Sequence, residues 1–350
     1  MKKRSKAVFW LIVLLALSAL TIYIIVSSND GFSLDKFLDC LETISPVWFV
    51  LAAACAFGFI YFEGAALRCI CHRLGCDFKR SRATVYAATD IYFSDITPSA
   101  AGGQPAAMVL MMKDGIPGAV AAIALVLNLA MYTLAILVLS LIAFLLNFDM
   151  FLGFDFPAQL FIGIGGVVQV AFIVLFAMCI FKKPLVHSLA AFILRLLCKL
   201  RILKDYEAHL VKLDASVEQY NKCGELIRHE YGFMLKVFLL NVAQRMSVIC
   251  VALCIFLGSG GSLEMLDAAF SAQTFAVLGS NAVPLPGAVG VVDYIFLTGF
   301  ETIVFDPVSV ELISRGLSFY ASFIFCGIVF LIEIAVRKIR TGKDAGESQD

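Results

Sequence analysis

Residues 90–117 read DIYFSDITPSAAGGQPAAMVLMMKDGIP, and this stretch decides the fold. Pro98 and Pro105 interrupt helical hydrogen bonding, while Gly102 and Gly103 permit backbone conformations that other residues avoid. The surrounding chain is 61% hydrophobic and 15% charged, with a mean hydropathy of +0.92. This composition indicates a membrane protein, in which broken backbone is tolerated only when it is buried in protein or lines a hydrated cavity.

Long apolar runs flank the interrupted stretch. A helix needs about 20 residues to cross a hydrocarbon core roughly 30 Å thick, and among these runs only 47–62 needs flanking residues to reach that length. Because lipid offers no partner for backbone groups, the runs are helices and not barrel strands. The sequence therefore predicts an all-α polytopic membrane protein with about six full spans, in the runs 8–26, 47–62, 118–146, 160–181, 233–257 and 308–336.

Positive charge gives the expected orientation. With the amino terminus in the cytoplasm, all but three of the 27 Lys and Arg residues lie on the cytoplasmic side. Lys36 alone stands on the opposite face, and Arg245 and Arg315 fall within spans. This pattern requires residues 83–112 to enter and leave the membrane on one side. A single crossing would move the basic segment 182–228 outside. Two crossings are excluded because each would have fewer than the roughly 20 residues that a span needs. We therefore expect a re-entrant helical hairpin there.

A second interruption, GSNAVPLPGAVGVVDYIF at residues 279–296, repeats this logic. Residues 268–300 have to return to the outer face, so that the span 308–336 ends at the basic carboxyl-terminal segment. The two hairpins then open in opposite directions, as an inverted repeat with a site at the bilayer midplane would require. One transmembrane domain is expected over residues 1–340, with halves 8–181 and 231–340, an amphipathic cytoplasmic connector at 184–230 and a disordered tail at 341–350.

The polar residues of both interruptions are candidate substrate ligands in a polar central cavity. We expect helix N-termini beyond Pro105 and Pro286 to direct N–H groups toward an anion such as a lipid phosphate. The alternative is that both loops only allow close helix packing. The candidate ligands are Asp90, Asp95, Thr97, Ser99, Gln104, Arg245, Asn281, Asp293 and Arg315, and the loop-shaping residues are Pro98, Gly102, Gly103, Pro105, Pro284, Pro286, Gly287 and Gly290.

Cations within spans require an anionic partner, because an unpaired charge at mid-bilayer costs several kcal/mol. Arg245 and Arg315 could each pair with an internal acid or with a bound phosphate, and the acids considered are Asp293, Glu63, Asp90 and Asp95. Glu63 and Arg68 stand near a span end and are interpreted as snorkelling to the interface. The interhelical hydrogen bonds are assigned to Asn128, Asn241, Gln244 and Gln273.

Sequence motifs of common enzymes are missing. The chain has no Walker A loop, no G-x-S-x-G elbow and no H-E-x-x-H pair, and its four His residues are scattered. The cluster Cys69, Cys71, His72 and Cys76 lacks the spacing of a zinc site. We therefore expect no catalytic residue, no metal, no cofactor and no ATP-driven transport by this chain alone.

The two interruptions also carry a family resemblance. With TPSAAGGQPAAMVLMMKDGIP at 97–117 and NAVPLPGAVGVVDY at 281–294, the chain resembles the lysylphosphatidylglycerol synthase transmembrane-region family, also called flippase-like domain proteins, over about residues 8–340. Pro98, Gly102, Gly103 and Pro105 match the first motif, and Pro286, Gly287 and Gly290 match the second. The family often has two adjacent Gly and a Glu in the second motif, where this chain has Gly287-Ala288 and Asp293.

The resemblance implies a function in lipid handling. Bifunctional relatives carry a soluble aminoacyltransferase domain after the membrane region, and no such domain follows Arg340 here, so we expect only the flippase-like part. The expectation is a multi-pass protein of the cell membrane, with both termini cytoplasmic, that flips or scrambles anionic or aminoacylated phospholipid. Two alternatives are a small-solute or ion-coupled transporter, and a scaffold that binds envelope-synthesis enzymes through residues 184–230. Phospholipids are the expected partners, a homo-oligomer is left open, and nucleic acid is not expected.

Overall fold

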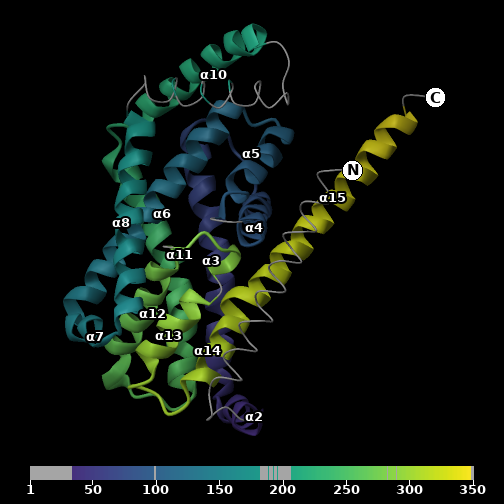
Figure 1. Ribbon diagram of the computed structural model, residues 1–350. Helices are drawn as coiled ribbons and strands as arrows, with labels where there is room; N and C mark the ends of the chain where they lie inside the picture. Colours follow the sequence, from purple (N-terminus) through teal and green to yellow (C-terminus); the bar gives the residue numbers. More distant parts are fainter. Residues whose placement is uncertain are drawn as a thin grey trace.

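A computed structural model describes residues 34–97, 100–181, 188, 192, 195, 206–281, 283–288 and 290–347. The predicted span 8–26, the loop residues Pro98 and Ser99, and much of the connector lie outside the described residues. Every regular element in the described part is a helix (Figure 1). The predicted all-α class is confirmed.

Five helical segments in the described part are long and apolar enough to span a membrane. They are α3 (Pro46–Arg73), α6 (Gly118–Leu146), α8 (Phe156–Phe181), α11 (Tyr231–Gly258) and the continuous segment formed by α14 (Pro307–Arg315), η4 (Gly316–Ala321) and α15 (Ser322–Glu347). The 28 residues of α3 make a helix about 42 Å long, which exceeds the hydrocarbon thickness. As predicted, the run 47–62 is extended by flanking residues.

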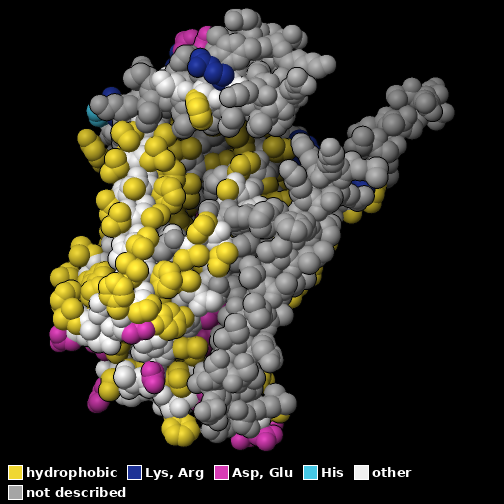
Figure 2. Space-filling model, in the orientation of Figure 1, with side chains coloured by type: hydrophobic (Ala, Val, Ile, Leu, Met, Phe, Trp, Pro, Cys, Tyr) yellow, Lys and Arg dark blue, Asp and Glu magenta, His cyan; other side chains and the backbone are white. Residues whose placement is uncertain are grey.

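Shorter helices lie at the two ends of the bundle. α2 (Leu34–Thr43) and α7 (Phe148–Gly153) lie at one end and α10 (Tyr206–Ile227) lies at the other (Figure 1). α10 falls in the connector, where amphipathic helices were expected, whereas α2 and α7 were not predicted. α15 continues to Glu347, so a helix occupies part of the segment predicted to be a disordered tail. On the face shown in Figure 2, Lys and Arg lie at the α10 end, most acidic side chains lie at the opposite end, and hydrophobic side chains fill the band between them.

The helices α3 and α11 pack against each other in antiparallel fashion along their length. At the α10 end, Arg73 Nη2 donates to Glu230 Oε1 at 2.8 Å. At the opposite end, the Ser45 amide donates to the Gly258 carbonyl at 3.4 Å. This helix pair therefore joins the two halves of the chain.

The first hairpin consists of α4 (Arg80–Asp95) and α5 (Gly103–Lys113). At its base, Arg82 Nε lies 2.5 Å from Asp114 Oδ2. Near its tip, Gln104 Nε2 donates to Asp90 Oδ2 at 2.8 Å. Since Arg82 and Asp114 join the two ends of the hairpin, these ends lie together at one end of the bundle, as a re-entrant hairpin requires.

The second hairpin consists of α12 (Leu266–Ser280), the short helix η3 (Pro286–Ala288) and α13 (Val291–Phe300). Gly299 packs against Ala272 near the base and Gly279 packs against Ile295 nearer the tip. The two hairpins lie in opposite halves of the bundle (Figure 1). The order of long helix, broken hairpin and long helix occurs twice, and this agrees with the hypothesis of an inverted repeat.

Ion pairs hold the first hairpin against α15. Arg82 Nη1 and Nη2 bind the two oxygens of Glu333 at 2.6 and 2.7 Å, and Arg337 pairs with both Glu333 and Asp114. Burial opposes ionisation of Asp114, but hydrogen bonds from Arg82, Tyr86 and Arg337 outweigh it and hold the pKa of this carboxyl below its ordinary value. The base of the hairpin is therefore tied to a membrane-spanning helix.

The tip of the first hairpin is packed too closely for any side chain at Gly103. A Cβ atom there would overlap the Asp90 and Ser94 side chains and the Asp90 carbonyl. We predict that Gly103→Ala lowers the free energy of unfolding by about 2 kcal/mol, because overpacking forces neighbouring atoms to move. Gly163→Ala on exposed α8, with open space around the new methyl group, is the control and should leave thermal stability in detergent equal or slightly higher. Equal melting temperatures for Gly103→Ala and wild type would contradict this packing.

Candidate functional site

A buried carboxylate, Glu63, lies at the centre of the bundle. It accepts hydrogen bonds from Asn128 Nδ2 of α6 at 2.6 Å and from Gln244 Nε2 of α11 at 2.5 Å. Asn241 Nδ2 in turn donates to Asn128 Oδ1 at 3.0 Å. Glu63 is only 5% exposed, so it does not snorkel to the interface, and that interpretation of the sequence was wrong. The interhelical role predicted for Asn128, Asn241 and Gln244 is confirmed.

These polar side chains separate two apolar clusters. One cluster contains Ala56, Ile136 and Ile249 and extends toward the α2 end. The other contains Leu67 and Val237 and extends toward the α10 end. The polar side chains of α3, α6 and α11 thus form a layer between two hydrophobic regions, and we call Glu63, Asn128, Asn241, Gln244 and Arg245 the polar layer.

Arg245 is the cation of this layer and is 8% exposed. Its guanidinium lies 3.9 Å from the Tyr132 ring centroid and 4.9 Å from that of Phe59. Glu63 lies within electrostatic range, yet no direct ion pair joins Arg245 to a carboxylate in the described part of the chain. Its Nε atom is buried and has no hydrogen-bond acceptor. The aromatic rings stabilise the charge, but hydrogen-bonding capacity remains for an anion.

The first interruption is closed by its own side chains. Asp90 is bound by Gln104 and, at 3.3 Å, by Ser94 Oγ. The Gly102 amide at the start of α5 donates to Thr97 Oγ1 at 2.8 Å, so this N–H is not directed at a ligand. Pro105 lies in the first turn of α5, where its missing N–H costs nothing. Pro98 and Ser99 lie outside the described residues.

The second interruption is closed by Asp293 and Arg315. Arg315 Nε lies 3.1 Å from Asp293 Oδ1, and its Nη2 donates to the Gly287 carbonyl at 2.9 Å. Asp293 Oδ2 accepts from the Gly290 amide at 2.7 Å. α13 begins at Val291, and Asp293 in its first turn binds the amide of the N-cap residue Gly290, while no side chain caps the first-turn amides. Asn281 also turns back, and donates to the Val277 carbonyl at 2.8 Å.

Backbone strain occurs at both interruptions. Ala100 and Ala288 are the non-glycine residues with positive φ in the described part, at 53° and 48°. Gly287, at φ 62°, packs against Phe319, so a Cβ atom would meet that ring. Strain of this kind costs about 1–3 kcal/mol per residue and persists only where surrounding structure enforces it.

Charges link the interruptions to the polar layer. Asp90 lies within electrostatic range of Glu63, and Asp95 lies within range of Arg315. η3, which contains Pro286 and Gly287, packs against α4 of the first hairpin. Of the predicted ligands, Asp90, Asp95 and Gln104 therefore lie near the tip of the first hairpin. Asp293 and Arg315 lie at the tip of the second hairpin. Arg245 lies in the polar layer, between α3 and α6.

Two acids of the site were not predicted as ligands. Glu63 was considered as a partner for Arg245 or Arg315 and as a snorkelling residue. Its burial could have been inferred from the apolar flanks IYF before it and GAAL after it. Glu311 of α14 is 3% exposed, faces Asp293, and has an Oε2 atom without a hydrogen-bond partner. No motif marks Glu311, which stands near the end of an apolar segment.

Removal of the Glu63 carboxylate should destabilise the bundle. Glu63→Ala leaves the amides of Asn128 and Gln244 without an acceptor and the charge of Arg245 without its nearest anion, so we predict a loss on the order of 3 kcal/mol. Glu63→Gln should cause a smaller loss because it keeps the volume and one acceptor. Thermal unfolding of the purified protein tests this, with exposed Glu301→Gln as the unchanged control. Equal stability of all three variants would contradict a structural role for the network.

Comparison with known proteins agrees with the architecture. The family model for the lysylphosphatidylglycerol synthase TM region matches residues 8–326, which include both hairpins and the polar layer. No curated protein and no solved structure matches the chain. Because the family model covers most of the chain, this membrane protein belongs to the family of the lysylphosphatidylglycerol synthase transmembrane region.

Proposed function

We propose that this protein moves phospholipid across the membrane as a flippase or scramblase, and that it catalyses no covalent change in the lipid. Arg245 is the observation that carries the proposal. Its guanidinium is buried between helices, stabilised by Tyr132 and Phe59, and retains an Nε–H without an acceptor. A group of this kind is suited to hold an anion during passage.

Phosphate is the anion that fits this cation best. The planar fork of arginine binds two oxygens of a phosphate at once, and the low dielectric of the bundle interior strengthens that interaction. Every glycerophospholipid carries a phosphodiester, so the same residue could serve lipids with different headgroups. Membership in a family named for lysylphosphatidylglycerol makes phosphatidylglycerol and its aminoacylated derivatives the first candidates.

The two hairpins would supply the steps on either side of Arg245. Each hairpin ends in a polar tip that is held by few hydrogen bonds, with Asp90 and Gln104 in one tip and Asp293 and Arg315 in the other. In the proposed mechanism, the lipid headgroup first replaces the internal partners at one hairpin tip, from one face of the membrane. It then replaces those at the other tip, from the opposite face. The acyl chains would remain in the bilayer, against helix surfaces such as that of α8, where Val167 is 71% exposed.

Reconstitution in liposomes tests the proposal. Labelled phosphatidylglycerol, lysylphosphatidylglycerol and phosphatidylcholine should each be assayed for movement from the inner to the outer leaflet. We expect wild type to accelerate at least one of them and Arg245→Lys, which keeps the charge but loses the fork, to reduce the rate about tenfold. Gly163→Ala on the exposed face of α8 should behave as wild type.

The same liposomes separate the alternatives. If folded wild-type protein accelerates none of the three lipids, the proposed function is wrong. If it catalyses counterflow of a water-soluble substrate without lipid movement, a small-solute transporter replaces it. If Arg245→Lys moves lipid at the wild-type rate, the Arg245 guanidinium does not bind the lipid phosphate during transport.

A further inference from the structure

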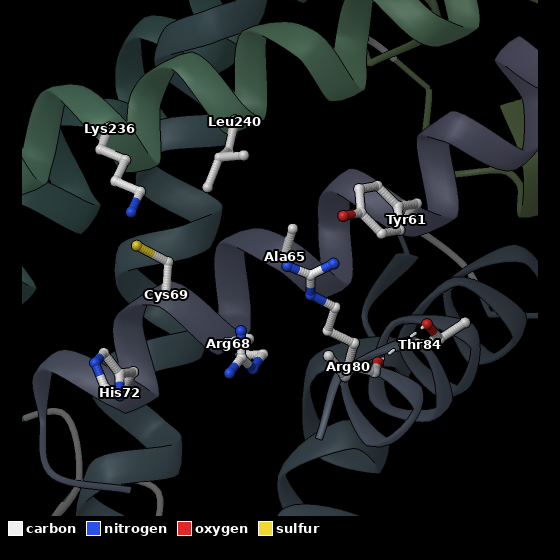
Figure 3. Close-up of a pocket in the computed structure, with 10 residues that line it drawn as sticks. Tyr61, Ala65, Arg68, Cys69, His72, Arg80, Thr84, Lys236 and Leu240 are labelled. Carbon is white, nitrogen blue, oxygen red and sulfur yellow. Dashed lines mark hydrogen bonds between the residues drawn. The ribbon is translucent and has the colours of Figure 1, made fainter. Parts of the chain in front are cut away.

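A second group of cations lies apart from the polar layer, at the α10 end of the bundle. A cleft of about 360 Å³ opens between α3, α4 and α11 (Figure 3). Arg68 and His72 of α3, Arg80 of α4 and Lys236 of α11 line it, and no carboxylate is among its lining residues. The volume is in the range of sites for small ligands.

Within the described residues, no carboxylate neutralises Arg68, Arg80 or Lys236 of this cleft. Arg68 Nε donates to the carbonyl of Phe78 at 2.8 Å, and this partner carries no charge. Nearby acids pair elsewhere, since Asp77 binds His72 and Glu230 binds Arg73. In the described part of the chain, no ion pair joins Arg68, Arg80 or Lys236 to a carboxylate. Three cations from three helices therefore line the cleft without a counterion among the residues that the structure describes.

The cleft changes from basic to apolar in a fixed direction. On α3, the lining residues run from His72 and Arg68 at the bundle end to Ala65 and Tyr61 nearer its middle. On α11, which runs antiparallel, Lys236 stands at the bundle end and Leu240 stands one turn deeper. Figure 3 shows Lys236 extending toward Cys69 and Arg80 reaching toward Ala65. Both walls therefore suit a molecule that is anionic at one end and apolar at the other.

The surfaces beside the cleft continue this pattern. Tyr61 and Phe57, one turn apart on α3, are 49% and 51% exposed, and Leu235 and Leu239 on α11 are 56% and 54% exposed. In addition, α4 begins at Arg80 without a side-chain cap, so the positive end of its helix dipole adds to the field of the cations. A free phosphate would contact only the cations at the basic end of the cleft, whereas a phospholipid would also cover its apolar walls.

We propose that this cleft binds the phosphate-bearing headgroup of an anionic phospholipid, whose acyl chains lie along the apolar flanks of α3 and α11. The proposal concerns binding alone, and it holds whether or not the protein translocates lipid. Arg68, Arg80 and Lys236 supply the charge, and Tyr61 and Leu240 begin the contact with the chains.

Native mass spectrometry with added lipid tests the proposal on the full chain. Wild type should retain one phosphatidylglycerol with an affinity at least tenfold higher than for phosphatidylcholine. The triple variant Arg68→Gln, Arg80→Gln, Lys236→Gln should lose that difference. A control triple variant, Lys113→Gln, Lys222→Gln, Lys338→Gln, removes the same charge from exposed positions outside the cleft and should bind within twofold of wild type. Arg80→Gln alone, at an exposed position where folding is not in question, should lower the affinity about threefold.

Three outcomes would overturn the proposal. Equal losses in the cleft and control triple variants would show that only overall charge matters. Equal affinity of wild type for phosphatidylglycerol and phosphatidylcholine would remove the headgroup specificity. Displacement of the lipid by glycerol 3-phosphate at the same concentration as by phosphatidylglycerol would identify a site for water-soluble phosphate esters instead.

Discussion

The hydrogen-bonded carboxylate of Glu63 is the interaction on which the rest of the structure depends. It draws α6 and α11 onto α3 through Asn128 and Gln244, in a part of the bundle where an unpaired charge would be costly. Hydrophobic burial alone gives helices in lipid little reason to associate, so polar contacts of this kind determine which helices meet. Through Glu63, the first and second halves of the chain share one polar layer.

The interruptions in the two hairpins follow from the same constraint. Freed backbone groups in lipid require partners, and Thr97 supplies one in the first hairpin while Asp293 and Arg315 supply them in the second. These local bonds make each tip stable without a ligand. Within the polar layer, Arg245 keeps an Nε–H without an acceptor and so retains capacity to bind an anion.

Much of the fold could be predicted from the sequence because membrane thickness limits the length of a span. The runs of apolar residues and the asymmetry of Lys and Arg were sufficient to predict the long helices and both hairpins. The partners of individual polar side chains could not be predicted, since they depend on which helix faces which. Glu63 and Arg68 have similar positions in the sequence, yet one is buried in the polar layer and the other lines the basic cleft. Asn281 lies in a predicted loop but satisfies its own helix.

The central claim is that both hairpins return to the face from which they entered, each from a different side. Single cysteines introduced at Ser81, Gly115, Glu264 and Thr302, in a chain whose eleven native cysteines are replaced, can be labelled with a membrane-impermeant thiol reagent from each side in turn. The account predicts that positions 81 and 115 react from one face only, and that positions 264 and 302 react only from the other. Reaction of the two ends of either hairpin from different faces would show a full crossing and contradict the account.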